Sequence, residues 1–510
     1  MKLLYTSLFN LFLASSIFAQ IEVISTDSLR AIDTDPEGGS SGGLVGGSTL
    51  YNSDSSLVGR KLVFWIHGLA GNEHSWNRIQ ASTENQTGNP IPDYPERNVE
   101  GYALSYKGSE NLNIFQLGGH VNNGLMETWR VSIPRRDTLD VRNNFAIAHS
   151  QGGIVARAIR YMNLVDSSNY HWQFGALATF GSPHRGAQII NSTQTGGLIQ
   201  TWIDDGCKKI SRGEIQTFVS TRWWLDALIS TSTVNSFSTL TCNGLNKMAL
   251  PILINAIRKP VGADYAVGAD NLAKLDSMAY LDTMKVVTFY GVEQEPVLWR
   301  TIHSMTYTKD SSIAGNPLST DPFGLNDDDE LPIFVNHKIS SYHAKWSSHN
   351  SRSNQLWYQI TSKSKNEKEK AEIYRNAHDW LAYANLNWKR FIGARKDTTY
   401  IDGYHCECLV NLGGTDGYQF TYQHVQNPSD CNDSLAVNCQ ANPKIVHTVI
   451  EEPNDGVVPV SSQIGYPNRF DSYLMENTNH MQERNCDETK ARLNQLFNGD
   501  YGDKFKLDKK

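Results

Sequence analysis

The strongest constraint on the fold of this chain is a turn of small residues. The turn lies between an apolar run and a segment with helical spacing. Residues 145–149 form the apolar run, Ser150 follows at once, and Gly152 and Gly153 open the helical pattern over 151–165. A strand that turns this sharply into a helix strains the backbone and leaves room only for small neighbours. The pattern predicts a nucleophile elbow, with the Ser150 hydroxyl at the tip of a sheet and a helix N-terminus behind it. The alternative is a Gly-rich turn that carries an ordinary exposed serine.

Other short apolar runs have the length and composition of buried strands, and helical patterns separate them. This alternation predicts a parallel sheet that is covered by helices on both faces. The expected strands are 61–66, 102–106, 145–149, 174–180, 284–291 and 470–475. A further run at 445–450 is expected to bring the chain back to the same sheet, and a helix is expected over 487–497 to close the domain.

The length of 510 residues exceeds that of one ordinary domain, so a core interrupted by insertions is expected. Residues 191–283 form either a lid over the site or an ordinary helical subdomain, and the sequence leaves both open. The expected organisation is a signal peptide at 1–19, a leader loop at 20–57, core at 58–190, a helical lid or cap insertion at 191–283, a core strand at 284–299, a disulfide-bearing insertion at 300–444 and core again at 445–510.

The N-terminus has the pattern of a secretory signal. Met1 and Lys2 give a short positive start, an apolar stretch runs to Phe18, and the small residue Ala19 precedes the expected cut. The stretch is too short and interrupted for a membrane span, although an uncleaved anchor helix is the alternative. We therefore expect a secreted, periplasmic or cell-envelope protein with no integral membrane span.

Seven cysteines in an exported chain predict disulfides, and the odd count leaves one cysteine free or paired elsewhere. The expected pairs are Cys207 with Cys242, and Cys406 and Cys408 with Cys431 and Cys439 in an order that the sequence leaves open. Zinc binding at His405–Cys408 is the alternative, but the sequence has no second matching cluster.

Charge and composition exclude some partners. The net charge of −7 shows no basic surplus, so nucleic acid is not an expected partner. The acidic loop at 326–330 matches no EF-hand spacing, which favours a solvated turn over a calcium site. We therefore expect no metal ligands.

A serine hydroxyl is a poor nucleophile unless a base takes its proton, an acid orients that base and amide donors stabilise the oxyanion. The chain offers an acid in Asp455, within an Asp-Gly-Val-Val turn, and a base in His480, after the last expected strand. Asp-Gly is also a plain turn signal, and Asp321 is the rival acid. The expected oxyanion donors are the main-chain N–H groups of Gln151 and Leu69.

Five segments together resemble the α/β-hydrolase superfamily of bacterial lipases and esterases, and the third is also similar to GPI-inositol-deacylase-like proteins. They are His67–Ala70, Ala148–Gly153, Gly181–Gly186, Asp455–Val458 and Asn479–His480. The resemblance implies an α/β-hydrolase fold with an eight-stranded, mostly parallel sheet, no cofactor and a Ser–Asp–His triad. Carried onto this chain, the triad is Ser150, Asp455 and His480, and the oxyanion donors are Leu69 and Gln151. Two departures are the Ala148 that replaces the first elbow glycine and the long interval between the serine and the acid.

The expected function is that of a secreted serine hydrolase, a lipase or carboxylesterase that cleaves carboxylic esters through an acyl-enzyme. Its expected partner is an ester or lipid substrate, with transient contact to a lipid interface. A serine amidase or peptidase on the same fold is one alternative. A non-catalytic binding module derived from a hydrolase is the other, motivated by the insertion at 300–444.

Overall fold

The computed structural model describes the chain in a series of ranges with gaps between them. The described residues are 22–25, 61–69, 71, 73–76, 79, 97, 99–106, 109, 112–132, 141–194, 198–221, 242, 260–306, 330–359, 363–411, 418–434, 436–468, 471–484 and 486–509. The expected signal peptide at 1–19, the rival acid Asp321 and most of the acidic loop at 326–330 lie outside the described residues.

The main sheet has seven described strands in the order β1-β3-β2-β4-β5-β6-β10. All neighbouring strands run parallel except β1, which pairs antiparallel with β3. The strands are β1 (Glu22–Ser25), β2 (Lys61–Ile66), β3 (Val99–Ser105), β4 (Phe145–His149), β5 (Ala176–Phe180), β6 (Lys285–Val292) and β10 (Ser472–Glu476). The fold class expected from the sequence, a mostly parallel sheet in an α/β arrangement, is confirmed, with seven described strands where the resemblance implied eight.

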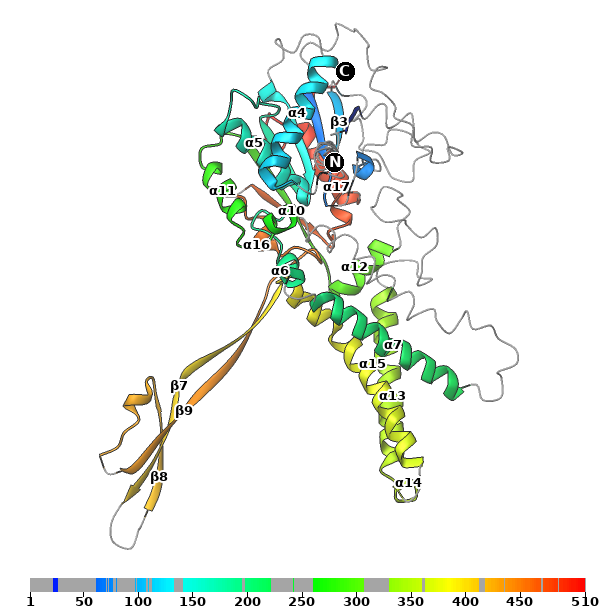
Figure 1. Cartoon of the computed structure of the whole chain (residues 1–510), viewed down its shortest axis with the longest axis vertical. Coiled ribbons are helices and arrows are strands. Elements are labelled where there is room, and N and C mark those ends of the chain that lie inside the picture. Colours follow the sequence, from blue (N-terminus) through cyan, green and yellow to red (C-terminus); the bar gives the residue numbers. More distant parts are fainter. Residues whose placement is uncertain are drawn as a thin grey trace, which may run out of the picture. The chain divides into compact units, whose positions relative to one another are not determined.

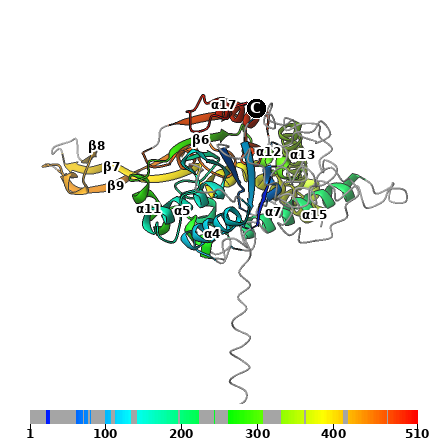
Figure 2. The ribbon, with the colours of Figure 1, turned by 90° about the horizontal axis from the view of Figure 1, so that it is seen from above.

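Helices cover both faces of this sheet, as Figure 2 shows. On one side α5 (Gln151–Val165) packs against α4 (Ile114–Ser132) and α11 (Asp270–Ala279). On the other side α17 (Asp487–Asn498) places Leu493 and Leu496 in the same buried cluster as Trp65 and the other side chains of that face. Strands β4 and β5 are buried along their whole length, which explains why they read as continuous apolar runs.

The leader expected at 20–57 contains one ordered element. Residues Glu22–Ser25 form β1 and pair with Tyr102–Ser105 of β3 at the edge of the sheet. The expectation of a loop was therefore wrong for these four residues. A short edge strand of this kind covers the free hydrogen-bonding groups of its neighbour.

A helical body accompanies the sheet in the same compact unit (Figure 1). Its helices are α6 (Gln188–Gln194), α7 (Leu198–Thr221), α12 (Val297–Thr306), α13 (Glu330–Ser353), α14 (Leu356–Gln359) and α15 (Lys363–Phe391). Helices α13 and α15 pack against each other, with α14 between them in the chain, and α7 packs along α15. The shorter described helices are α10 (Pro260–Asp264), α16 (Val460–Gln463), η2 (Glu73–Trp76), η4 (Val141–Asn143), η6 (Pro428–Asp430) and η7 (Gln482–Arg484). Among the helices described, none is both long and apolar enough to cross a membrane.

The two expected insertions contribute to one helical body. Trp202 of α7 stacks on Trp380 of α15 with ring centroids 4.9 Å apart. A Cβ on Gly206 would lie 2.0 Å from the Trp380 ring, so α7 needs a glycine at this position to approach so closely. The expected disulfide between Cys207 and Cys242 is present and anchors α7.

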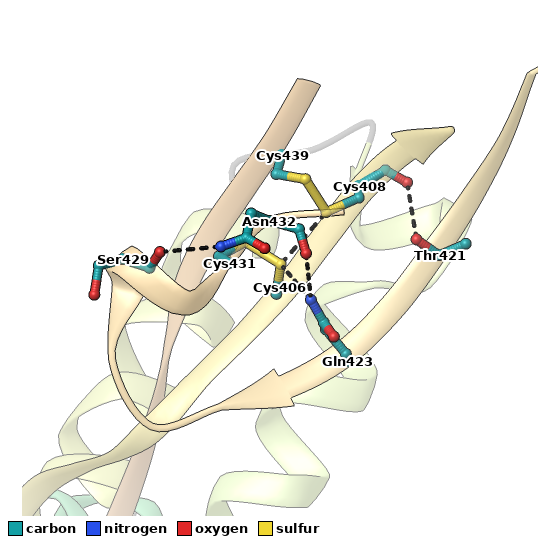
Figure 3. The surroundings of a disulfide bond; sticks show 8 residues. All are labelled: Cys406, Cys408, Thr421, Gln423, Ser429, Cys431, Asn432 and Cys439. Atoms are coloured by element: carbon teal, nitrogen blue, oxygen red, sulfur yellow. Dashed lines mark hydrogen bonds between the residues drawn. A yellow bond between two sulfur atoms is a disulfide. The ribbon is translucent and has the colours of Figure 1, made fainter. Parts of the chain in front are cut away.

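Residues Ala394–Glu452 form a second compact unit. It is a three-stranded antiparallel sheet in the order β8-β7-β9, built from β7 (Arg395–Asn411), β8 (Tyr418–Val425) and β9 (Ala436–Glu451). Its core is small and centres on Cys406, Cys408 and Val410. Figure 3 shows the two disulfides of this core, which pair Cys406 with Cys431 and Cys408 with Cys439. The structure thus gives the pairing order that the sequence left open.

The strand expected at 445–450 exists, but its expected partner was wrong. These residues belong to β9, where Ile445 pairs with Ile401 and Ile450 with Lys396 of β7. Both Ile445 and Ile450 are more than half exposed, so the apolar run does not mark a buried strand of the main sheet. The first unit resumes at Pro453.

Replacing both Cys408 and Cys439 by serine is expected to open the second unit. Their disulfide closes a separation of 31 residues, and a loop of this size contributes about 3–4 kcal/mol in the chain-entropy view. Besides this disulfide, the small core leaves the sheet only its strand pairing and the Cys406–Cys431 bond among the described residues. Limited proteolysis should therefore cut faster within 404–439. The paired serine substitution of Cys207 and Cys242 is the control and should leave cutting in this range unchanged. Equal cutting in all three proteins would contradict the prediction.

Candidate active site

Ser150 occupies the sharp turn between β4 and α5. Its φ of 52° and ψ of −125° lie in a strained region that few residues other than glycine adopt. Its main-chain N–H donates to the Phe180 carbonyl at 2.9 Å, which fixes the turn to β5. A Cβ on Gly152 would lie 2.6 Å from the His67 carbonyl oxygen, and a Cβ on Gly153 would lie 2.2 Å from a serine hydroxyl. The close approach of neighbouring groups explains why the elbow has glycines at both positions.

The structure brings the three expected residues of the triad into one hydrogen-bonded chain. The Nε2 atom of His480 lies 2.8 Å from Ser150 Oγ, and its Nδ1 atom lies 2.7 Å from Asp455 Oδ2. His480 follows β10, and its main-chain N–H donates to the Asp455 carbonyl at 2.8 Å. Asp455 is fully buried and His480 is 6% exposed, so the bond between them is shielded from water, while the bond to Ser150 is only partly buried.

The turn that carries Asp455 is built to hold a carboxylate. The other carboxylate oxygen, Oδ1, accepts the main-chain N–H groups of Val457 at 2.8 Å and Val458 at 2.6 Å. Gly456, directly after the acid, has a φ of 91°, a conformation that favours glycine. The Asp-Gly pair is therefore a turn signal and an acid position at the same time, and the carboxylate cannot rotate freely.

His149, which precedes Ser150, holds the histidine loop in place. Its Nε2–H donates to the His480 carbonyl at 2.7 Å, and the two rings lie 4.8 Å apart. Burial, together with the nearby His480 ring, lowers the pKa of His149 well below its usual value. The ring is therefore neutral, which suits a hydrogen-bond donor in a buried site. No role for this histidine was expected from the sequence, although it lies directly before Ser150.

Glu483 is a second buried carboxyl that the sequence analysis missed. Its Oε1 accepts the Gly291 main-chain N–H at 2.6 Å, while its Oε2 lies 3.5 Å from His480 Nδ1 and has no hydrogen-bond partner among the described residues. Burial, followed by the charge of Asp455, raises the pKa of Glu483 well above its usual value. The protonated form is favoured, because two ionised carboxylates beside one imidazole would repel each other.

The residues expected to stabilise an oxyanion lie next to Ser150. Gln151 opens α5 directly after Ser150, and a Cβ on Gly68, which precedes Leu69, would lie 2.9 Å from Ser150 Cβ. Within the described part of the chain, the main-chain N–H groups of Leu69 and Gln151 have no acceptor. The Gln151 side chain donates to the Tyr265 hydroxyl at 2.9 Å, which draws it toward Tyr265.

The Gly181–Gly186 segment has a structural role, because it connects strand β5 to helix α5. The Nε2 atom of His184 lies 3.1 Å from Thr179 Oγ1, and Arg157 of α5 donates to the His184 carbonyl at 3.0 Å. Burial lowers the pKa of His184 well below its usual value, which keeps the ring neutral. The segment thus ties the end of β5 to α5, behind the elbow.

A group of possible metal ligands coincides with this site. One nitrogen each of His149 and His480 and one oxygen of Glu483 lie within 4.8 Å of one another. Both histidines already take part in hydrogen bonds, to the His480 carbonyl and to Asp455. The geometry therefore fits a hydrogen-bond network around an imidazole.

The strand order, the elbow after β4 and the histidine loop after β10 define the α/β-hydrolase fold. No protein-family model and no curated protein sequence matches the chain. Among solved structures, lipase BlEst2 of Bacillus licheniformis in its mature form is 13% identical, with 47% of this chain and 68% of that chain covered and a TM-score of 0.25. Esterase RhEst1 of a Rhodococcus species is 10% identical, with 46% and 74% covered and a TM-score of 0.25. Phospholipase PlaB of Legionella pneumophila is 11% identical, with 48% and 39% covered and a TM-score of 0.25.

These TM-scores are well below 0.5, so the assignment of the fold rests on the strand order and turns of this chain. More particularly, the chain combines the α/β-hydrolase fold with two other parts. These are a helical body formed by the two insertions and a disulfide-bonded sheet at Ala394–Glu452.

Replacing Glu483 with glutamine is expected to change how stability depends on pH. Because the pKa is raised in the folded chain, the stability that this carboxyl contributes is present below its usual pKa of 4.5 and is lost as the pH rises toward the raised value. Glutamine has no such proton, so the Tm of the variant relative to the natural protein should rise as the pH increases from 4.5 toward the raised pKa of Glu483. Glu476→Gln, at an exposed carboxyl, is the control. A relative Tm that is flat across this range would contradict the prediction.

Proposed function

We propose that this protein is an exported serine hydrolase that cleaves carboxylic esters, as a lipase or carboxylesterase. Ser150 is the proposed nucleophile, His480 the general base and Asp455 the acid that orients it. The observation that carries the proposal is the hydrogen-bonded chain from Ser150 Oγ through His480 to Asp455 at a strained turn. A base within hydrogen-bond reach of a hydroxyl, itself oriented by a third group, is the arrangement that nucleophilic serine catalysis requires.

The proposed reaction has two halves. His480 Nε2 takes the Ser150 proton as Oγ attacks the ester carbonyl, and the resulting imidazolium returns that proton to the leaving alcohol. A water molecule then gives its proton to the same nitrogen, attacks the acyl group, and releases the carboxylic acid with the Ser150 hydroxyl restored. The oxyanion of each tetrahedral intermediate is assigned to the main-chain N–H groups of Leu69 and Gln151, and their lack of acceptors among the described residues supports this role.

Export is part of the proposal. Three disulfides join six cysteines of the described chain, and disulfides persist in oxidising compartments. The signal-like segment at 1–19 supports the same location. Transient contact with a lipid interface is also proposed, because the proposed ester substrates include lipids.

Matched substrates test the reaction class and the acyl group together. The protein should hydrolyse p-nitrophenyl esters and leave the corresponding p-nitroanilides intact, and a series of ester chain lengths should reveal the preferred acyl group. Faster turnover of the anilides would favour an amidase or peptidase. A fluorophosphonate probe, which reacts with activated serines, should label Ser150 of the folded protein. No labelling and no turnover would favour a binding module.

A further inference from the structure

The acid turn is in direct contact with the helical body. The indole N–H of Trp388, near the end of α15, donates to the Gly456 carbonyl at 2.8 Å. Trp388 is 1% exposed, so the bond is shielded from competing water. Gly456 directly follows Asp455, and the next two main-chain N–H groups hold the Asp455 carboxylate. The bond from Trp388 therefore restrains the middle of the turn that fixes the carboxylate.

Helix α12 lies against the same turn. A Cβ on Gly456 would lie 2.1 Å from the Thr301 hydroxyl oxygen, and Thr301 is fully buried. That hydroxyl donates to the Val297 carbonyl one turn earlier in α12, so it is held in place. The turn thus packs against α12 so closely that a side chain at position 456 would collide with it.

The same helix also reaches the histidine loop. Asn479, the fully buried residue before His480, donates from Nδ2 to Ser304 Oγ of α12 and to Glu293 Oε2, both at 2.8 Å. Its Oδ1 accepts the main-chain N–H of Met481 at 3.1 Å. The residues on both sides of His480 are therefore fixed through one amide that α12 anchors.

Helices α12 and α15 are themselves joined near these contacts. The Leu298 main-chain N–H donates to Asn385 Oδ1 at 2.9 Å, and Asn385 Nδ2 donates to Glu295 Oε2 at 2.6 Å. Lys389, next to Trp388, pairs with the other oxygen of Glu295 at 2.6 Å. The two helices consequently contact the acid turn and the histidine loop as one joined element.

We propose that α12 and α15 form a support that positions the acid turn and the histidine loop, and that Trp388 is a positioning residue for Asp455. The inference rests on the proposed function, in which Asp455 orients His480. Trp388 touches no reacting atom and acts through the Gly456 peptide. Without the bond from Trp388 to Gly456, the acid turn becomes more mobile. The Asp455 carboxylate is then out of hydrogen-bond reach of His480 Nδ1 for part of the time.

Trp388→Phe tests this role, because it removes the indole N–H and keeps a buried aromatic ring. We expect kcat for a p-nitrophenyl ester to fall roughly five- to tenfold, the effect of one lost hydrogen bond, with KM nearly unchanged. Amide hydrogen exchange should become faster in residues 454–459 and stay unchanged in 151–165. The exchange measurement needs no activity.

Trp380→Phe is the matched control, because it makes the same change in the same helix. The Trp380 indole donates to the Trp202 carbonyl at 3.3 Å, within the contact between α7 and α15. This variant should keep the kcat of the natural protein and its exchange in 454–459. Ser304→Ala is the second test and should speed exchange in residues 479–482, with a lower kcat.

The outcomes separate this inference from the proposed function. Equal kcat and equal exchange in Trp388→Phe and Trp380→Phe would overturn the positioning role. If the natural protein hydrolyses no ester and reacts with no fluorophosphonate, the proposed function fails. The rate of amide hydrogen exchange in residues 454–459 of Trp388→Phe then still decides whether Trp388 holds the acid turn.

Discussion

Replacing Ser150 with alanine is expected to lower kcat for ester hydrolysis by roughly 10⁶-fold, as in enzymes whose serine nucleophile is removed. The hydroxyl supplies the atom that bonds to the acyl carbon, and no other described group of the site replaces it. Labelling by a fluorophosphonate probe should disappear together with turnover. Because alanine keeps the β-carbon at the strained φ of 52°, thermal unfolding should change little.

Ser182→Ala is the matched control for this substitution. Ser182 is a buried serine close to the elbow, and its hydroxyl has no hydrogen-bond partner among the described residues. The control should retain turnover and labelling. Full activity in Ser150→Ala would show that the nucleophile lies elsewhere and would end the proposal of an acyl-enzyme at the elbow.

Replacing Asp455 with asparagine is expected to cause a smaller but still severe loss. An amide in place of the carboxylate can donate to His480 Nδ1, which moves the ring proton to Nε2 and leaves no base toward Ser150. In serine hydrolases this change costs about 10⁴-fold in kcat while the geometry is kept. Here Glu483 Oε2 lies 3.5 Å from the same nitrogen, so a second acidic group is at hand.

The single variant should therefore lose less activity than the double variant. The charge of Asp455 helps to raise the pKa of Glu483, and its removal makes that carboxyl easier to ionise. Ionised Glu483 can then accept the Nδ1 proton, so Asp455→Asn should recover activity as the pH rises. Asp455→Asn with Glu483→Gln should show the full loss of about 10⁴-fold at every pH. Equal rates for the single and double variants would rule out this help from Glu483.

The elbow was predictable because its constraints are local. A buried strand, a strained serine and two close-packed glycines lie within nine residues, so each leaves its mark on the sequence. The strands β2, β4, β5 and β6 were predictable for a similar reason, since most of their side chains are buried on both faces. The turn with Asp455 and the loop with His480 were found from turn composition and chain order. Only the structure shows that Asp455 and His480 join Ser150 in one hydrogen-bonded chain.

Nonlocal contacts account for what the sequence analysis missed. The residues at 445–450 have the composition of a strand, but composition does not say which strand lies beside it. Glu483 reads as an ordinary charge on a short turn, and only its burial beside His480 gives it meaning. Trp388 is one apolar residue on a long helix, and nothing in the helical pattern points to its bond with Gly456. Each residue has a hydrogen-bond partner far away in the chain, Gly456 for Trp388 and Gly291 for Glu483.

The stacking of Trp202 on Trp380, with Gly206 beside it, makes the two insertions mutually dependent. A chain shortened by residues 330–391 would leave an indole and a glycine notch of α7 bare to water, and would also remove the bond to the acid turn. A shortened protein therefore requires the deletion of both insertions together. The alternative is to replace the apolar residues on the uncovered side of α7 by polar residues.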